Sequence, residues 1–291
     1  MRLENCHVGI IGVGLIGGSI AAALMEGDRV RTVSGWDHDA GALESAWGRG
    51  ILTKTAPSLK KLVSEVDLLI LALPIRYLVP VSFDALPFVE DGLKAVLDVA
   101  SVRAGVSQEL ADIWGPRHLG FHPMAGKEKS GIANASADLF RGATVALIPS
   151  PQTSEEAKDF GVKLASAIGA SPLTLEPEEH DEIVACVSHL PMILASALSL
   201  VAGERMEVLP DLPSLAAGGF RDTTRVASGP SWLVSDVWAR NGKAIGGVLR
   251  RFVEVLRTME EATPGEMEYL AEKAGAARDA VLTGVPRRCR V

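Results

Sequence analysis

The sequence predicts an α/β protein, with a Rossmann-type doubly wound parallel sheet in the N-terminal domain and an all-α C-terminal domain. Between residues 8 and 148, short runs rich in Val, Ile and Leu alternate with longer helix-like segments, the pattern of β-α units stacked around a parallel sheet. Pro172 and Pro177 then mark a linker, and no convincing strand follows. The 291 residues indicate about two domains, which we expect at residues 1–172 and 173–291.

The strands of the N-terminal domain are predicted from continuous apolar runs, which are expected where both faces of a sheet are covered. Prolines at positions 74, 123 and 149 follow three of these runs and end them, because proline has no N–H to donate to a strand ladder. The expected strands are residues 8–11, 30–36, 67–73, 95–99, 119–121 and 144–148, and a further helix is expected at residues 154–168.

The C-terminal domain is predicted from helical spacing. From Ile183 to Val201 apolar residues recur every three or four positions, and the positions between them are also small or apolar, so this helix should be buried nearly all round. Such a helix needs neighbours on every side. Helices expected at residues 232–241, 245–261 and 264–282 supply some of them, and a second subunit is expected to supply the rest.

Charge and hydropathy argue against several classes of partner. The formal net charge is -7, so the surface as a whole repels nucleic acid and anionic membranes. The most apolar stretch is identified as residues 68–80, which contains Arg76 and is too short to span a bilayer. The arginines at positions 287, 288 and 290 are interpreted as a solvated tail. We therefore expect neither a nucleic-acid nor a membrane partner.

The three cysteines, Cys6, Cys186 and Cys289, lie far apart and fit neither the spacing of a zinc site nor a disulfide framework. The N-terminus lacks a signal-peptide pattern, because glycines interrupt its apolar stretch. A cytoplasmic location is the expectation that fits both observations.

A glycine motif follows the first predicted strand and opens a predicted helix, which is the context that gives this motif its meaning. Gly12 allows a tight turn, Gly14 lets a pyrophosphate approach the backbone, and Gly17 lets helix and strand pack closely. The start of the helix, at Leu15 and Ile16, supplies N–H groups and the positive end of a dipole. The motif predicts a dinucleotide site.

Asp37 follows the second predicted strand, about twenty residues beyond the last glycine of the motif. A carboxylate there accepts hydrogen bonds from both adenosine ribose hydroxyls and repels a 2′-phosphate, which favours NAD over NADP. The neighbouring residues add no arginine that would bind a phosphate. The alternative is a plain glycine turn followed by a helix-capping aspartate.

Polar residues also gather where a doubly wound sheet places its ligand crevice, beyond the carboxyl ends of the strands. These segments are residues 98–101, 120–131, 188–191 and 219–225. Together they resemble the prephenate/arogenate (cyclohexadienyl) dehydrogenase family, with Gly-Leu-Ile-Gly-Gly-Ser at 14–19 and His-Pro-Met-Ala-Gly at 122–126 the most specific pieces. The resemblance runs from about residue 8 to residue 236.

The resemblance implies an enzyme of tyrosine biosynthesis with a small-molecule substrate. Its reaction would be the NAD-dependent oxidative decarboxylation of prephenate to 4-hydroxyphenylpyruvate, with no metal, in a homodimer formed through the helical domain. The alternatives are an arogenate dehydrogenase that gives tyrosine and, from a different class, a sensor that binds NAD without turnover. Another two-domain dehydrogenase, such as a 3-hydroxyacid dehydrogenase or an imine reductase, is a further rival.

In that family the histidine that matches His122 is the catalytic base, and the serine that matches Ser101 hydrogen-bonds the substrate hydroxyl. Histidine titrates near neutrality, so it can accept a proton and return it. From the residues alone, His122 is also a candidate turn histidine before Pro123, and Ser101 a candidate cap for a helix that begins near Val102.

Substrate-binding residues follow from the same resemblance. Arg225 matches the arginine that binds the substrate carboxylate, for which bidentate pairing is suited. Glu128 is expected at the pocket mouth, and Asp222 near Arg225. The alternatives are a solvated loop acid for Glu128 and a structural ion-pair cluster for Asp222 and the arginines around it.

One histidine of the next helix also matches the family. His189 corresponds to the first histidine of the segment Ser-His-Leu-Pro-His and is expected to line the pocket; a satisfied core histidine is the alternative. The second histidine is replaced by Met192, which leaves the choice between prephenate and arogenate open. His180 and Asp181 precede the helix and are interpreted as caps. The role of Trp232 is not assigned.

Overall fold

The computed structural model describes residues 2–27 and 29–284. Cys289 and the C-terminal arginines lie outside the described residues. The chain divides into two compact units, Met1–Ala244 and Ile245–Val291. The first holds the sheet, its helices and the helical segments up to the middle of α11, and the second holds the rest of α11 and α12.

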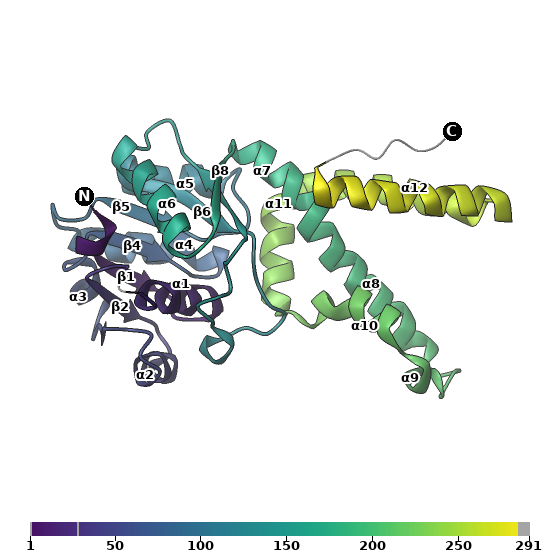
Figure 1. Cartoon of the computed structure of the whole chain (residues 1–291), viewed down its shortest axis with the longest axis horizontal. Helices are drawn as coiled ribbons and strands as arrows, with labels where there is room; N and C mark the ends of the chain where they lie inside the picture. The colour runs from purple at the N-terminus through teal and green to yellow at the C-terminus, as the bar shows by residue number, and fades with distance from the viewer. Residues whose placement is uncertain (1, 28, 285–291) are drawn as a thin grey trace. The chain divides into compact units, whose positions relative to one another are not determined.

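The first unit is built on one sheet of eight strands in the order β3-β2-β1-β4-β5-β6-β7-β8 (Figure 1). Neighbouring strands are parallel except for β6 and β7, which are antiparallel. The strands are β1 His7–Ile11, β2 Thr32–Trp36, β3 Lys54–Thr55, β4 Leu68–Leu71, β5 Ala95–Asp98, β6 His118–Pro123, β7 Thr144–Ile148 and β8 Ser171–Thr174. The predicted α/β class with a Rossmann-type sheet is confirmed.

Every residue of β4, β5 and β6 is buried. Successive side chains of a strand point to opposite faces, so complete burial means that helices cover both faces of the sheet. The covering helices are α1 Leu15–Met25, α2 Ala40–Gly48, α3 Leu59–Val63, α4 Ile75–Ala85, α5 Val106–Trp114 and α6 Glu155–Ala167. Short 3₁₀ turns lie at η1 Leu3–Asn5, η2 Leu86–Phe88, η3 Gly115–Arg117 and η4 Ile132–Asn134.

Two strands of the sheet were not predicted, and both lie at its edges. β3 has only two residues, both exposed, and so carries no apolar run. β8 contains Pro172, which the sequence analysis assigned to a linker. The assignment was wrong because an edge strand has one unpaired side and tolerates the missing N–H of proline.

The strand order reverses at β1, which pairs with β2 on one side and with β4 on the other. The connections therefore leave in opposite directions at this point, and a crevice opens beyond the carboxyl ends of β1 and β4. The residues that follow β1, β2, β4 and β5, together with the end of β6, all lie at this edge of the sheet.

The helical part begins with a run from Pro177 to Arg205, made of α7 Pro177–Val184, a π-helical turn η5 Ala185–His189 and α8 Leu190–Arg205. It continues with α9 Leu212–Leu215, α10 Gly218–Thr224, the 3₁₀ turn η6 Arg225–Ser228, α11 Ser231–Glu260 and α12 Pro264–Thr283. α11 bends at Asn241, whose φ of -122° and ψ of 17° are not helical. This bend falls where the sequence predicts the end of one helix and the start of the next.

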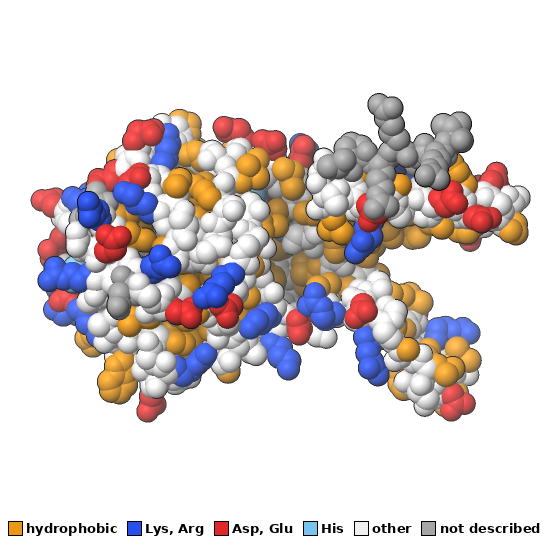
Figure 2. All heavy atoms as spheres, viewed as in Figure 1, with side chains coloured by type: hydrophobic (Ala, Val, Ile, Leu, Met, Phe, Trp, Pro, Cys, Tyr) orange, Lys and Arg blue, Asp and Glu red, His pale blue; other side chains and the backbone are white. Residues whose placement is uncertain are grey.

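The apolar helix predicted to be buried nearly all round is largely exposed in the single chain. Leu190 and Ala195 are the buried residues of α8, whereas Leu200 is 68% and Val201 57% exposed. Figure 2 shows hydrophobic side chains at the surface of this limb of the molecule. The described residues of the first unit therefore leave much of this helix uncovered.

The same helical run corrects the search for a membrane segment. The run from Pro177 to Arg205 contains an 18-residue window with a mean hydropathy of 2.0, so it is long and apolar enough to cross a membrane by length and composition alone. By length and composition, this run and not residues 68–80 is therefore the segment that could cross a membrane. A helix that packs against protein passes the same test, and the buried polar contacts described below belong to this helix.

Candidate active site

The glycine turn after β1 has the geometry that a dinucleotide needs. Gly12 has a φ of +92°, and a Cβ on it would lie 2.3 Å from the carbonyl oxygen of Ala72. A Cβ on Gly17 would lie 2.0 Å from the carbonyl oxygen of Gly12. A Cβ on Gly14 would have no described atom within 4 Å. The first and last glycines are therefore required by the fold, and the middle one leaves open space beside the backbone.

This open space lies at the start of α1. Gly14 is the N-cap of the helix and has no side chain to cap it. Leu15 and Ile16 are the first helical residues. The N–H groups of the first helical turn have no partner within the helix, and the helix dipole adds positive potential there. The backbone thus forms an anion site that fits a pyrophosphate.

Asp37 is fixed to the same turn. Its Oδ2 accepts a hydrogen bond from the N–H of Val13 at 2.7 Å, and its Oδ1 accepts one from the N–H of Asp39 at 3.0 Å. The carboxylate also lines a hollow of about 430 Å³ together with Trp36 and Trp47. A ribose seated beside the glycine turn would meet this carboxylate, so these residues fit a dinucleotide with free ribose hydroxyls.

His122 lies in β6, opposite Ala146 of β7, and only 9% of the residue is exposed. Its Nδ1 is 2.8 Å from Nε2 of His180, and the two rings meet edge to face with centroids 5.0 Å apart. Burial lowers the pKa of His122 well below its ordinary value of 6.5, and the neighbouring His180 and Arg103 lower it further. The ring is therefore a neutral base at pH 7.

His180 and Asp181 do not cap their own helix. The N-cap of α7 is Glu176, and no side chain caps it. Nδ1 of His180 lies 2.9 Å from Oδ1 of Asp181. Asp181 also accepts hydrogen bonds from the backbone N–H groups of Arg103 and Ala104, at 2.8 and 2.9 Å. The interpretation of this pair as caps of the following helix was wrong, and both residues are buried beside His122.

Ser101 follows β5 and is half-buried. It does not cap a helix, because α5 begins only at Val106 and has Gly105 as its N-cap. The capping alternative for Ser101 is therefore wrong. The loop that carries Ser101 is held by the Arg103 guanidinium, which donates to the carbonyl oxygens of Asp98 and Ala100.

A buried ion pair anchors this loop. Nη1 of Arg103 donates to both carboxylate oxygens of Asp98 at 2.8 Å, and Nε2 of His118 lies 2.9 Å from the same carboxylate. All three side chains are fully buried. Burial alone would raise the pKa of Asp98, but Arg103 and His118 hold it well below its usual range.

His189 joins the same cluster from the end of the π-helical turn. Its Nδ1 lies 3.2 Å from Nδ2 of Asn241, which also donates to the carbonyl oxygen of Asp181 at 2.9 Å. Burial lowers the pKa of His189 to about 4, despite the opposing charge of Asp181. The bend of α11 at Asn241 thus lies beside His189 and Asp181.

The residues predicted at the pocket mouth are only partly brought together. Arg225 donates to Glu128 at 2.8 Å, although 97 positions separate them. The pKa of Glu128 is lowered by its own backbone N–H and by Arg225. Asp222 is exposed on α10, and the structure gives it no bond to either residue. Met192 is half-buried.

Sequence reasoning missed the structural parts of the site, which are His180, Asp181, Asn241 and the Asp98–Arg103 pair. The contact between His122 and His180 joins residues 58 positions apart, and the contact between Asn241 and Asp181 joins residues 60 apart. An adjacent His-Asp pair at the start of an apolar helix was the available signal. Nothing local indicated its partner.

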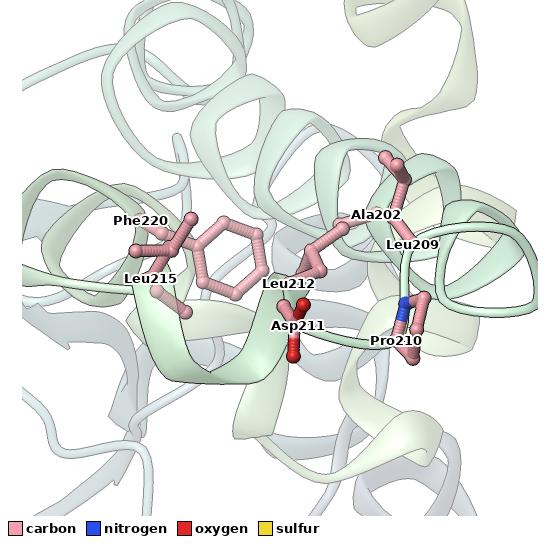
Figure 3. Close-up of a pocket in the computed structure, with 8 residues that line it drawn as sticks. Ala202, Leu209, Pro210, Asp211, Leu212, Leu215 and Phe220 are labelled. Atoms are coloured by element: carbon pink, nitrogen blue, oxygen red, sulfur yellow. The ribbon is translucent and has the colours of Figure 1, made fainter.

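Another hollow, of about 450 Å³, lies at the far end of α8. Figure 3 shows Leu212, Leu215 and Phe220 gathered around it, with Asp211 as its one charged residue. The hollow holds none of the predicted site residues. Its apolar lining suits packing against protein rather than proton transfer.

The fold and the site together define a class. A glycine turn opens a helix at the switch point of a doubly wound sheet, an acid follows the second strand, and a buried neutral histidine lies at the same edge of the sheet. Such a protein is a dinucleotide-dependent oxidoreductase.

Comparison with known proteins gives the family. Residues 20–171 match the family model described as "Prephenate dehydrogenase, nucleotide-binding domain", and residues 176–274 match "Prephenate dehydrogenase, dimerization domain". Prephenate dehydrogenase of Bacillus subtilis is 32% identical over 87% of this chain and 68% of its own length. Cyclohexadienyl dehydrogenase of Zymomonas mobilis is 30% identical over 91% of this chain and 92% of its own length. The chain belongs to the prephenate dehydrogenase family.

Solved structures agree. Prephenate dehydrogenase from Aquifex aeolicus, in complex with hydroxyphenyl propionate and NAD+, superposes with a TM-score of 0.85 at 27% identity, covering 95% of this chain and 97% of that one. Synechocystis arogenate dehydrogenase gives 0.77 at 27% identity, covering 94% and 99%. A 3-hydroxyisobutyrate dehydrogenase from Salmonella typhimurium, at 17% identity and 0.53, shares the fold alone. The resemblance stated from the sequence is confirmed.

Proposed function

We propose that this protein catalyses the NAD-dependent oxidative decarboxylation of prephenate to 4-hydroxyphenylpyruvate. The observation that carries the proposal is the state of His122, a buried and neutral imidazole at the edge of the sheet where the dinucleotide binds. Within this family, such a base beside a dinucleotide site fits the removal of a hydroxyl proton during hydride transfer.

The residues divide the work by position. His122 accepts the proton of the substrate's ring hydroxyl, and Ser101 hydrogen-bonds the same hydroxyl to orient it. The turn of Gly12, Gly14 and Gly17 and the N–H groups of Leu15 and Ile16 would hold NAD, with Asp37 on the adenosine ribose. The bound nicotinamide would accept the hydride. Arg225 binds a substrate carboxylate, with Glu128 at the mouth of the pocket and His189 along its wall.

The reaction balances without a metal. The ring carbon that carries the hydroxyl loses hydride, and His122 holds the hydroxyl proton. The bond from the ring to its carboxylate then breaks, and carbon dioxide leaves while the bonding electrons complete the aromatic ring. His122 returns its proton to the resulting phenolate oxygen, so the base is regenerated at the end of the turnover.

Arogenate is the second candidate substrate, because Met192 stands where the family segment has its second histidine. A methionine side chain neither donates a strong hydrogen bond nor carries charge, so this wall does not distinguish a keto group from an amino group. With arogenate the same chemistry would give tyrosine.

The test offers prephenate and arogenate separately, each with NAD and with NADP. We expect turnover with NAD and, for His122→Asn, a loss of kcat of about 10²- to 10⁴-fold, because the proton has no acceptor. His7→Asn is the matched control, since His7 lies at the start of β1 and contacts Thr32. NAD binding without turnover of either substrate would support a non-catalytic sensor and remove the proposal.

The assembly is part of the same proposal. The C-terminal match is to a dimerization domain, and the exposed apolar surface of α8 requires a cover. We infer a homodimer formed through the helical domain, which begins after β8, next to the expected boundary between residues 172 and 173. Asp222 is included among the substrate-binding residues on the resemblance alone.

A further inference from the structure

His122 is the outer member of a chain of three buried side chains. Its Nδ1 faces Nε2 of His180 at 2.8 Å, and Nδ1 of His180 faces Oδ1 of Asp181 at 2.9 Å. His180 and Asp181 are 1% and 3% exposed, so solvent does not compete for these bonds. The proposed function uses only His122 and leaves the other two residues without a role.

The positions of the protons in this series of hydrogen bonds follow from Asp181, its innermost member. An ionised carboxylate can only accept hydrogen bonds, so Nδ1 of His180 carries a proton and donates it to Asp181. In the neutral form of His180, Nε2 is then without a proton and accepts from His122. Nδ1 of His122 must therefore carry a proton, which leaves its Nε2 with a free lone pair.

Asp181 is itself held in place. The backbone N–H groups of Arg103 and Ala104 donate to its two oxygens, and Arg103 is fixed by its buried pair with Asp98. The carboxylate therefore cannot rotate away from His180 without breaking several buried hydrogen bonds. The orientation of the base is thus set by the loop that also carries Ser101.

Other groups around the base do not replace this chain. Asp98 approaches from the end of β5, Arg103 from the loop after it, and His189 from the π-helical turn. Arg103 is committed to Asp98, and Nδ1 of His189 is bonded to Asn241. Among the residues that the structure describes, His180 alone is hydrogen-bonded to the ring of His122.

We propose that His180 and Asp181 are positioning residues that fix the tautomer of His122 and stabilise the imidazolium that forms when it takes the substrate proton. The stabilisation of the imidazolium rests on the proposed function. The tautomer of His122 is a property of the protein without substrate and does not depend on that function. The arrangement follows the logic of a catalytic triad, in which a buried carboxylate orients the imidazole, here through an intervening imidazole.

The tautomer can be measured directly. The chain has six histidines, so ¹⁵N-histidine labelling with two-bond ¹H–¹⁵N correlation gives a spectrum that single substitutions can assign. In the free wild-type protein at pH 7 we expect His122 protonated at Nδ1. In His180→Leu, which removes the acceptor, we expect proton population at Nε2. His7→Gln should leave the His122 signals unchanged.

Steady-state kinetics test whether His180 and Asp181 stabilise the imidazolium of His122. We expect His180→Leu to lower kcat by roughly 10- to 100-fold, the range known for groups that orient a metal-bound imidazole, with little change in the KM for NAD. His180→Gln, whose amide oxygen can accept from His122, should recover much of the loss. Asp181→Asn should keep the Nδ1–H tautomer but lower kcat, because the charge that stabilises the imidazolium is gone.

The outcomes separate the two proposals. An Nε2–H tautomer of His122 in the wild type, or an unchanged tautomer and kcat in His180→Leu, would overturn the positioning role even if the enzyme is active. Absence of turnover with both substrates would remove the proposed function while the spectra still decide the tautomer. If His180→Leu does not fold, as judged by circular dichroism, the Gln and Asn variants decide, and an undiminished kcat in Asp181→Asn counts against the proposal.

Discussion

His122 and His189 are both buried and neutral, but their ring nitrogens are arranged differently. Nδ1 of His189 faces the amide of Asn241, whose nitrogen is identified by its bond to the carbonyl oxygen of Asp181. Nδ1 of His189 therefore accepts, and its proton lies on Nε2. The two rings thus differ at Nε2, which carries a lone pair in His122 and a buried proton in His189.

The pH dependence of activity follows from the burial of the base. Because the pKa of His122 lies well below 6.5, its neutral form persists as the pH falls, and protonation removes the base only at lower pH. We expect the acid limb of kcat/KM well below pH 6.5 and a plateau at neutral pH. The profile from pH 5 to 8 measures this, and an acid limb at or above pH 6.5 would contradict it.

The buried pair of Asp98 and Arg103 should dominate the stability of the loop. Arg103→Met removes the guanidinium and leaves the buried Asp98 carboxylate with His118 and the N–H of Ala100, so we expect a loss of about 3 to 5 kcal/mol in the free energy of unfolding. Lys54→Met is the control, because its partner Glu65 is partly exposed and the pair should contribute at most about 1 kcal/mol. Urea unfolding gives both values. Equal losses would show that the burial of Asp98 costs little.

Residues whose role depends only on their neighbours in the sequence could be predicted from it. The positive φ of Gly12 and the close approach at Gly17 follow from a glycine pattern between a strand and a helix. His180 was not foreseeable as a neighbour of His122, since only the folded chain brings a residue of α7 beside β6. The exposure of Asp222 also depends on how α10 packs, which spacing does not specify.

At the scale of elements, the π-helical turn explains how one helix presents two histidines to the same neighbours. His180 and His189 are nine residues apart, and at about 100° per residue an α-helix would place them roughly 180° apart. The π turn at Ala185–His189 accommodates one extra residue, which reduces the angle to about 80°. Both side chains then reach the loop and the bend around Asp181 and Asn241.

A change of one residue in this turn should therefore have opposite effects in the two directions. Deletion of the exposed Val187 should convert the turn to regular α-helix and keep both histidines in place, so we expect most of the activity to remain. Insertion of one alanine after Val187 should rotate His189 away and cost about 10²-fold in kcat, the cost that a displacement of 1 Å can have. Steady-state kinetics distinguish the two. A tolerated insertion together with an inactive deletion would refute this account of the turn.

The edge strands mark the limit of what the pattern of elements can predict. The central strands formed where apolar runs predicted them, and β7 has the predicted bounds. β8 pairs with β7 although all its residues are exposed, so no apolar run announces it. Its pairing depends on the ladder that β7 offers, and that ladder exists only once the sheet has formed.

At the scale of the whole molecule, the apolar surface of α8 is the surface on which the proposed homodimer depends. Leu200→Glu changes an exposed residue of the single chain, so it should fold, but a charge at a buried dimer interface should weaken association. We expect a homodimer for the wild type and a shift toward monomer for the variant, measured by light scattering after size exclusion. Val162→Glu, an equally large change at an exposed position of α6, is the control. A monomeric wild type would exclude the proposed assembly.

Gly120 stands two residues before the base in the most buried part of β6. A Cβ at this position would lie 2.6 Å from Nη1 of Arg103 and 3.1 Å from Cβ of Ile148. The missing methyl group leaves room for the guanidinium beside Asp98, the residue that Gly120 faces on the neighbouring strand. Residues with high strand propensity are therefore barred from this position, and a thermostabilising library built on such propensities would eject the cation beneath the active site.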